Sequence, residues 1–131
     1  MNPTEAVDNL HKKDLFTQWL GIERLATGAG FCTLQMVVRP EMCNGFGIAH
    51  GGITYSLADS ALAFASNSHG RQALSIETSI SHLKALVPGD TIIATATEQH
   101  LSYKTGVYEV RIEKENGELV ALFKGTVYRK G

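Results

Sequence analysis

The sequence predicts an α+β domain in which one antiparallel β-sheet curls around one long helix. Three observations lead to this fold class. The segment from Gly51 to Asn67 is rich in Ala, Leu and Phe and contains no proline, and no other stretch predicts a long helix. Much of the remaining chain alternates apolar and polar residues with period two, which is typical of strands. The length of 131 residues leaves room for one domain, residues 1–131, and for no second.

The composition excludes several classes of partner. With 44% hydrophobic residues the chain can build a real core. Its 12 basic and 13 acidic residues give a net charge of -1 and no basic stripe, so we expect no nucleic-acid partner. The segment Met1 to Leu20 carries several charged residues, which argues against an apolar signal segment and a membrane span. The expected location is cytoplasmic.

Cysteine and histidine spacing predicts neither a disulfide framework nor a metal site. Cys32 and Cys43 are too few for such a framework and fit a reduced intracellular chain. No Cys-x-x-Cys or His-x-x-x-His spacing occurs, so we expect no metal and no cofactor. No basic partner adjoins Cys43 in sequence to activate its thiol, and we do not expect it to be a nucleophile.

The chain begins with a segment, Thr4 to Leu20, whose apolar residues recur at helical spacing. We expect one or two short amphipathic helices with Thr4 as the N-cap and Gly21 as the stop. Phe16 and Trp19 are interpreted as packing groups rather than as a ligand-stacking pair. Beyond this segment the pattern changes to period two and predicts a half-buried strand that ends at Arg39-Pro40, with an apolar face formed by Cys32, Leu34, Met36 and Val38.

The central feature is a glycine-rich loop from Asn44 to Gly52 and the helix that starts at about Gly51. At about 100° per residue, one face of this helix is apolar and is formed by Ile53, Leu57, Ala61 and Phe64. The opposite face is also mostly small or apolar and holds Gly52, Tyr55, Asp59 and Ala63. We therefore expect a helix covered on nearly all sides, with Asp59 as an acid in a poorly solvated place.

The second half of the chain predicts strands separated by turn signals. Residues 74–81 alternate, and the alternation then shifts, which suggests a bulge or bend near His82 before the turn at Pro88-Gly89-Asp90. Further strands are expected at Thr91 to His100, Val107 to Glu113 and, after a tight-turn signal, Leu119 to Tyr128. A sheet with one helix keeps uncovered edges, so we expect the chain to pair with a second copy as a homodimer.

Two interpretations of Asp59 remain open at this level. The acid either bonds a backbone group or a base, or it is a general base or nucleophile whose environment sets its reactivity. The preceding loop favours the second interpretation. Free N–H groups at a helix start can polarise a carbonyl, and Gly51 and Gly52 would let a substrate approach them.

The run Asn-Gly-x-Gly-x-x-His-Gly-Gly at residues 44–52, followed by Leu-Ala-Asp at residues 57–59, resembles the hotdog-fold acyl-CoA thioesterases, in particular the PaaI-like family of phenylacetic acid degradation. Pro88-Gly89-Asp90 and the segments at 105–110 and 121–126 resemble the same family, so the resemblance covers nearly the whole chain. It implies a hotdog fold, an acyl-CoA substrate, and assembly as a dimer of dimers, that is, a homotetramer.

The resemblance also implies roles for particular residues. Asp59 matches the catalytic carboxylate, and Gly51 or Gly52 would supply the backbone N–H that polarises the thioester. Gly52 and Asp59 lie roughly 10 Å apart along one helix at about 1.5 Å per residue, so the two would have to come from different subunits. Asn44 either orients the water or thioester or is only a turn residue, and His50 either orients the loop or is only structural.

The acyl group is left open by the sequence. Four residues are candidates to line an apolar pocket for an aromatic, phenylacetyl-like, or medium-chain acyl group: Phe46, Tyr55, Leu57 and Phe64. His82 is a weaker candidate for this pocket. Two other functions stay in view besides thioester hydrolysis: a hotdog hydratase or dehydratase, and a non-catalytic acyl-CoA-binding protein.

Overall fold

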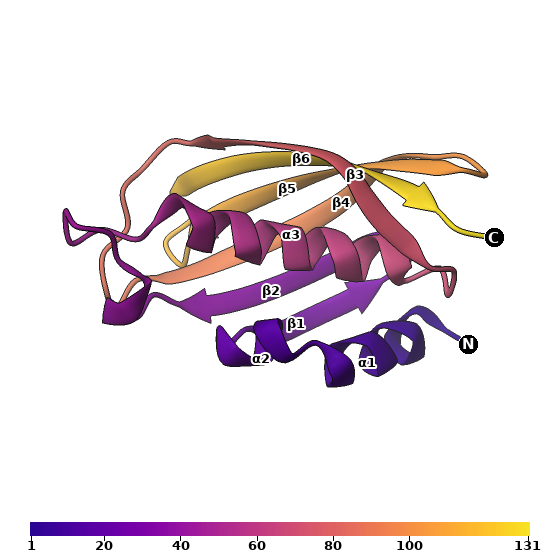
Figure 1. Ribbon diagram of the computed structural model, residues 1–131, viewed down its shortest axis with the longest axis horizontal. Helices are drawn as coiled ribbons and strands as arrows, with labels where there is room; N and C mark the ends of the chain where they lie inside the picture. Colours follow the sequence, from indigo (N-terminus) through magenta and orange to yellow (C-terminus); the bar gives the residue numbers. More distant parts are fainter.

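The computed structural model describes residues 1–131 and consists of one six-stranded antiparallel sheet with a long helix, α3 (Gly51–Asn67), across one face (Figure 1). The strand order is β1-β2-β4-β5-β6-β3. The α+β class is thereby confirmed, with one sheet curled around one long helix. The other elements are α1 (Pro3–Lys13), α2 (Leu15–Trp19), β1 (Glu23–Gly28), β2 (Phe31–Val37), the short 3-10 helix η1 (Pro40–Met42), β3 (Ala73–His82), β4 (Thr91–Leu101), β5 (Thr105–Lys114) and β6 (Leu119–Arg129).

The first helix begins earlier than the sequence predicted. Its N-cap is Asn2 and not Thr4, because Oδ1 of Asn2 accepts the backbone N–H of Glu5 at 2.8 Å. Pro3 occupies the start of α1, where its fixed φ and missing N–H suit a helix N-terminus. An asparagine side chain in front of a proline is therefore the stronger start signal here.

Helix α2 is held by a cap and stays partly exposed. Asp14 ends α1 and caps α2, with its Oδ1 accepting the backbone N–H of Thr17 at 3.0 Å. Phe16 and Trp19 stack with ring centroids 6.1 Å apart. Both rings remain exposed outside the core, and the Arg39 guanidinium lies over the Trp19 ring.

Two strands precede the glycine-rich loop where the sequence predicted one. β1 and β2 form a hairpin whose turn contains Gly30 with φ of 68°, a backbone conformation that favours glycine. β2 alternates as predicted, with Cys32, Leu34 and Met36 buried. β1 lies at an edge of the sheet and has no fully buried residue, so its residues carry no clear period-two signal.

The core lies between α3 and the sheet. Leu57, Ala61 and Phe64 are fully buried in a cluster of 26 buried hydrophobic residues. The helix approaches β6 closely at Gly125, where a Cβ would lie 2.6 Å from Cδ2 of Leu62. A glycine at this position lets the helix pack directly on the strand.

The opposite face of α3 is open in the single chain. Gly52 is exposed, and Tyr55, Asp59 and Ala63 are half-buried. The expectation of a helix covered on nearly all sides is therefore not met by one chain. None of the helices combines the length and the apolar composition that crossing a membrane requires.

Strand β3 is a free edge with exposed apolar side chains. Leu74 and Ile76 are 54% and 63% exposed, although their alternation predicted a half-buried strand. The register shift lies between Ser75 and Glu77, not near His82. The change of alternation near His82 instead marks the end of the strand, beyond which the chain leaves the sheet.

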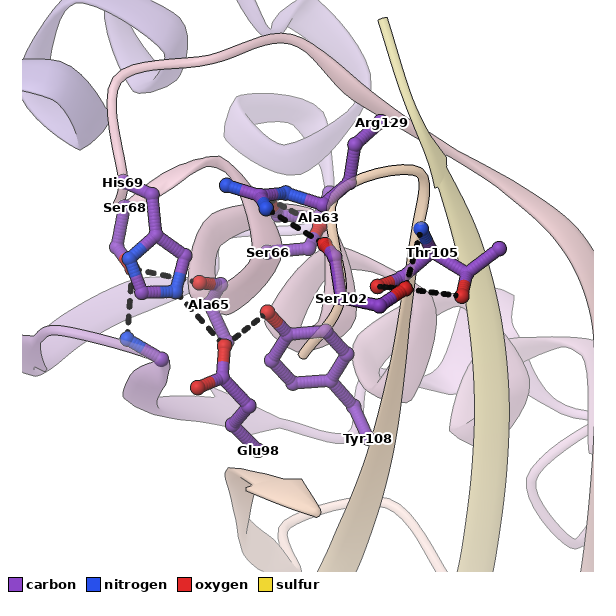
Figure 2. A network of polar contacts seen from close by, with 11 residues as sticks. Ala63, Ala65, Ser66, Ser68, His69, Glu98, Ser102, Thr105, Tyr108 and Arg129 are labelled. Atoms are coloured by element: carbon purple, nitrogen blue, oxygen red, sulfur yellow. Dashed lines mark hydrogen bonds and ion pairs between the residues drawn. The ribbon is translucent and has the colours of Figure 1, made fainter. Parts of the chain in front are cut away.

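A polar network fixes the C-terminal end of α3 (Figure 2). Glu98 of β4 accepts the Tyr108 hydroxyl at 2.6 Å, and the same carboxylate oxygen lies 2.7 Å from Nε2 of His69, just beyond α3. Burial by itself would raise the pKa of the Glu98 carboxyl, but the hydrogen bonds from Tyr108 and His69, with the charges of His69 and Arg129, lower it. The ionised carboxylate thus ties the end of α3 to the sheet.

Candidate active site

The glycine-rich loop is a tight turn held by Asn44. Its Oδ1 accepts the N–H of Phe46 at 2.9 Å, and its carbonyl accepts the N–H of Gly47 at 3.0 Å. Gly47 has φ of 77°, which a residue with a side chain rarely adopts. Asn44 is therefore a turn residue, and its Nδ2 makes no hydrogen bond within the chain. Phe46, at the tip of the turn, is 90% exposed.

His50 caps α3 and occupies one of the two candidate N–H groups. Its Nδ1 accepts the N–H of Gly52 at 2.9 Å, so this ring nitrogen carries no proton. The N–H of Gly51 makes no hydrogen bond. Gly51 and Gly52 were both candidate N–H donors, and only the N–H of Gly51 is free for a substrate carbonyl.

A cavity of about 350 Å³ opens beside this helix start. It brings His82, from the end of β3, next to Gly51: a Cβ on Gly51 would lie 3.2 Å from Nε2 of His82. The absence of a side chain at Gly51 thus keeps the free N–H accessible. The lining comprises Asn44, Ile48, Ala49, Gly51, Thr54, His82, Leu83, Lys84, Ala85 and Leu86.

Asp59 lies two turns further along α3 and has no partner. Its half-buried carboxylate makes no hydrogen bond and no ion pair within the chain. Burial raises the pKa of the Asp59 carboxyl, and the negative charge of Asp14 raises it further. The interpretation of Asp59 as an acid bonded to a backbone group or a base does not fit a single chain, and a carboxylate without a protein partner is free to act on a ligand.

A second cavity, of about 170 Å³, adjoins Asp59. Its walls come from α3, the start of β3 and the end of β6, and they are mainly apolar with two serine hydroxyls. The residues that line it are Asp59, Leu62, Ala63, Ser66, Ala73, Leu74, Ser75 and Val127.

The residues expected to line an acyl pocket lie elsewhere. Leu57 and Phe64 are fully buried core residues, because they lie on the face of α3 that packs on the sheet. Tyr55 joins α3 to β3 through a 2.7 Å hydrogen bond between its hydroxyl and that of Thr78. Phe46 projects from the loop into solvent. None of the four lines the cavity at Asp59. Leu57 and Phe64 are core residues instead of pocket residues, whereas a role of Phe46 and Tyr55 in an acyl pocket stays a prediction.

The residues that do line this cavity carried only weak signals in the sequence. Leu62 and Ala63 belong to the helix, but their positions on it do not reveal which neighbouring strand they face. Leu74 and Ser75 were assigned to a strand whose edge position was not predicted. Only the fold brings these two segments together.

The two candidate groups lie apart within one chain. Gly51 and Asp59 are eight residues apart in α3, so about 12 Å separates them along the helix axis at about 1.5 Å per residue. They open into different cavities. No cluster of three or more His, Cys, Asp or Glu side chains suited to a metal ion is present, and burial raises the pKa of the Cys32 thiol to about 12.

Residues 46–121 match the Thioesterase superfamily. Over 93% of its length the chain is 38% identical to the acyl-coenzyme A thioesterase PaaI of Escherichia coli, of which it covers 87%. The structure of the E. coli PaaI protein, from the phenylacetic acid degradation operon, superposes with a TM-score of 0.97 at 36% identity, covering 98% of this chain and 94% of that one. A mutant of the phenylacetic acid degradation protein PaaI from Thermus thermophilus gives 0.86 at 39% identity, with 89% and 100% covered. A Streptococcus mutans protein bound to acetyl-CoA gives 0.81 at 26% identity, with 84% and 89% covered.

Proposed function

This chain belongs to the thioesterase superfamily as a PaaI-like hotdog thioester hydrolase, and we propose that it hydrolyses an acyl-CoA to a free acid and CoA with Asp59 as the reacting carboxylate. The observation that carries this assignment of Asp59 is its lack of any partner in a half-buried position beside a cavity. A carboxylate held in this way is available to a water molecule or to a carbonyl carbon.

Gly51 and Asp59 each form one half of the proposed site, and each half-site supplies one requirement of the reaction. The free N–H of Gly51, at the positive end of the α3 dipole, binds the thioester oxygen and stabilises the oxyanion that forms on it. Asp59 removes a proton from water as the water oxygen attacks the carbonyl carbon, and the CoA thiolate then leaves. His50 holds the loop by capping α3, and His82 lines the approach to Gly51. No cofactor takes part in these steps.

The alternative role of Asp59 is direct attack on the carbonyl carbon, which forms an anhydride that water then hydrolyses. A single turnover in H₂¹⁸O distinguishes the two roles. If Asp59 attacks the carbonyl carbon and water then attacks the Asp59 carbon of the anhydride, the acid is unlabelled and the enzyme gains ¹⁸O, which a general base cannot produce. A general base places ¹⁸O in the product acid and leaves the enzyme unlabelled, and trapping of the anhydride separates this from attack of water on the acyl carbon.

The edge strand β3 explains how the two half-sites can meet. An antiparallel pair of β3 strands about their midpoint, near Glu77 and Thr78, would place the His82 end of one strand opposite the Leu74 end of the other. Since Gly51 adjoins His82 and Asp59 adjoins Leu74, the free N–H of one chain would then face the carboxylate of the other. The same pairing would cover the exposed Leu74 and Ile76 and satisfy the open strand edge.

The cavity at Asp59 is the proposed acyl pocket. Its volume of about 170 Å³ and its walls of Leu62, Ala63 and Leu74 suit an aromatic ring or a medium chain better than an acetyl group. The names of the E. coli and Thermus relatives agree with a phenylacetyl-type substrate. We therefore place phenylacetyl-CoA first among the candidate substrates.

Release of CoA tests the proposal. Purified protein is incubated with acetyl-, hexanoyl-, benzoyl- and phenylacetyl-CoA and with an enoyl-CoA; free thiol is measured with DTNB, and the acyl products are identified by mass spectrometry. Turnover of the aryl and medium-chain substrates is the expected result. Binding without thiol release would favour a non-catalytic acyl-CoA-binding protein, and turnover of an enoyl-CoA to a hydroxyacyl-CoA without thiol release would favour a hydratase.

A further inference from the structure

The joint between α1 and α2 packs against the turn of α3 that carries Asp59. Thr17, which is fully buried, links the two sides. Its N–H donates to Oδ1 of Asp14 at 3.0 Å, and its hydroxyl lies 3.1 Å from the hydroxyl of Ser60, the residue after Asp59. Asp14 is thus fixed by a residue that is itself bonded to the reacting turn.

A second contact fixes the other side of the joint. The ring of His11, near the end of α1, lies against the ring of Phe64, with centroids 5.0 Å apart. Burial and the charge of Arg24 lower the pKa of His11, against the opposing charges of Asp14 and Asp8. The neutral imidazole is therefore favoured, and it leaves the charge of Asp14 uncompensated near neutral pH.

The other surroundings of Asp59 carry little charge. Within α3 the one further ionisable group is the Tyr55 phenol, whose hydroxyl is bonded to Thr78. The cavity walls from β3 and β6 contain no acid or base. In the proposed two-chain site the approaching chain contributes His50, whose Nδ1 accepts the N–H of Gly52, and also His82 and Lys84, which line the cavity at Gly51. Asp14 is the neighbouring acid whose charge acts on Asp59.

We propose that Asp14 is a positioning residue for the reaction: held by Thr17 beside the turn that carries Asp59, it sets the electrostatic environment of the reacting carboxylate by placing a second negative charge near it. A like charge close by disfavours the ionised form of Asp59, and this makes Asp59 a better proton acceptor. The inference rests on the proposed function, since it assumes that Asp59 acts as a base.

Asp14→Asn tests this, because asparagine is an equally good N-cap and only the charge is removed. The kcat of the parent and the variant is measured across pH with phenylacetyl-CoA. The acidic limb of the pH profile is the range in which kcat falls as Asp59 takes up a proton, and in the variant this limb should move to lower pH. At a pH on that limb the variant should keep a larger fraction of its plateau rate than the parent does, by about twofold or more. On the plateau it should be slower, because its base is weaker.

Three matched variants keep the result interpretable. Asp14→Ser also keeps a cap without a charge and should move the limb in the same direction. Glu5→Gln changes the net charge equally at an exposed position of α1 and should leave the profile unchanged. Thr17→Val keeps the Asp14 charge and loses the contact with Ser60, so it should lower thermal stability without moving the limb.

The outcomes separate the inference from the proposed function. An acidic limb that stays in place in both Asp14 variants, or that moves equally in Thr17→Val, overturns the role of Asp14 while hydrolysis still depends on Asp59. Full activity of Asp59→Asn would instead overturn the proposed function, and the role of Asp14 with it.

Discussion

Replacing Asp59 by asparagine separates a catalytic role from a structural one, because the two roles predict opposite effects on stability. The change keeps the size of the side chain and removes its ability to take a proton. General-base catalysis contributes about 10²- to 10⁴-fold in rate. The cavity at Asp59 contains no other carboxylate or imidazole from the same chain that could replace it. We therefore expect kcat for phenylacetyl-CoA to fall by about 10²-fold or more, which is about 3 kcal/mol of transition-state stabilisation.

The effect on stability follows from the pKa of Asp59. Burial and the charge of Asp14 raise this pKa in the folded chain, so the folded state binds the proton more tightly than the unfolded state does. The resulting contribution to stability is present at pH below the unfolded pKa and is lost as the pH rises through the folded pKa. At pH 7 the ionised carboxylate destabilises the fold, and Asp59→Asn should have a Tm equal to or above that of the parent.

The measurement combines DTNB detection of free CoA at saturating substrate with thermal unfolding at pH 7 and size-exclusion chromatography. Asp90→Asn offers a control on a second half-buried aspartate, which accepts the N–H of Val87 and pairs with Lys114. That variant should lose stability and keep its kcat. Near-parental turnover of Asp59→Asn, or a lower Tm with an unchanged kcat, would refute the assignment of Asp59 as the base.

The remaining predictions concern the shared site, the acyl pocket and the polar network. Asp59→Ala and Gly51→Pro should each be inactive alone. Subunit exchange between equal amounts of the two variants should restore about a quarter of the parental activity, because half of the random dimers are hybrids and each hybrid has one intact site of two. Proven exchange without rescue would contradict a two-chain site, and Gly51→Ala, which keeps the N–H, controls for the added Cβ. The kcat/KM for phenylacetyl-CoA should exceed that for acetyl-CoA by about tenfold or more, because burial of the aromatic ring adds a few kcal/mol of binding free energy. Ala63→Leu should reduce this preference by filling the cavity. Equal kcat/KM for both substrates in the parent would argue against an apolar pocket. Glu98→Gln should lower the free energy of unfolding at pH 7 by about 1 to 3 kcal/mol in denaturant unfolding. The difference from the parent should shrink as the pH falls through the lowered pKa of Glu98, because the stability gained from a lowered pKa is present above the pKa of the unfolded chain and is lost as the pH falls through the pKa of the folded chain. A difference that does not change with pH would contradict the stabilising role of the ionised carboxylate.

The sequence by itself was sufficient to identify the functional groups that lie within one continuous segment of the chain. The loop at 44–52 and the helix after it follow from glycine content and from the absence of proline, and the structure places His50 at the cap and Gly51 at the first turn. Asp59 stood out because an acid among small apolar residues is unusual. Period two was sufficient to predict β2 and the later strands. All of these signals depend on neighbours in the chain.

Contacts between segments distant in the chain were decided by the tertiary structure. Periodicity indicates which residues of an element share a face, but it does not say what that face meets. Leu57 and Phe64 were therefore assigned to a pocket, although they face the sheet. Leu74, which lines the cavity at Asp59, was not identified as part of the site. Three features of the site depend on contacts that form only on folding: the free N–H of Gly51, the exposed edge of β3, and the charge of Asp14 near Asp59. A strand order that brings β3 beside the helix, and a helix joint that brings Asp14 beside it, are properties of the topology and not of any local pattern.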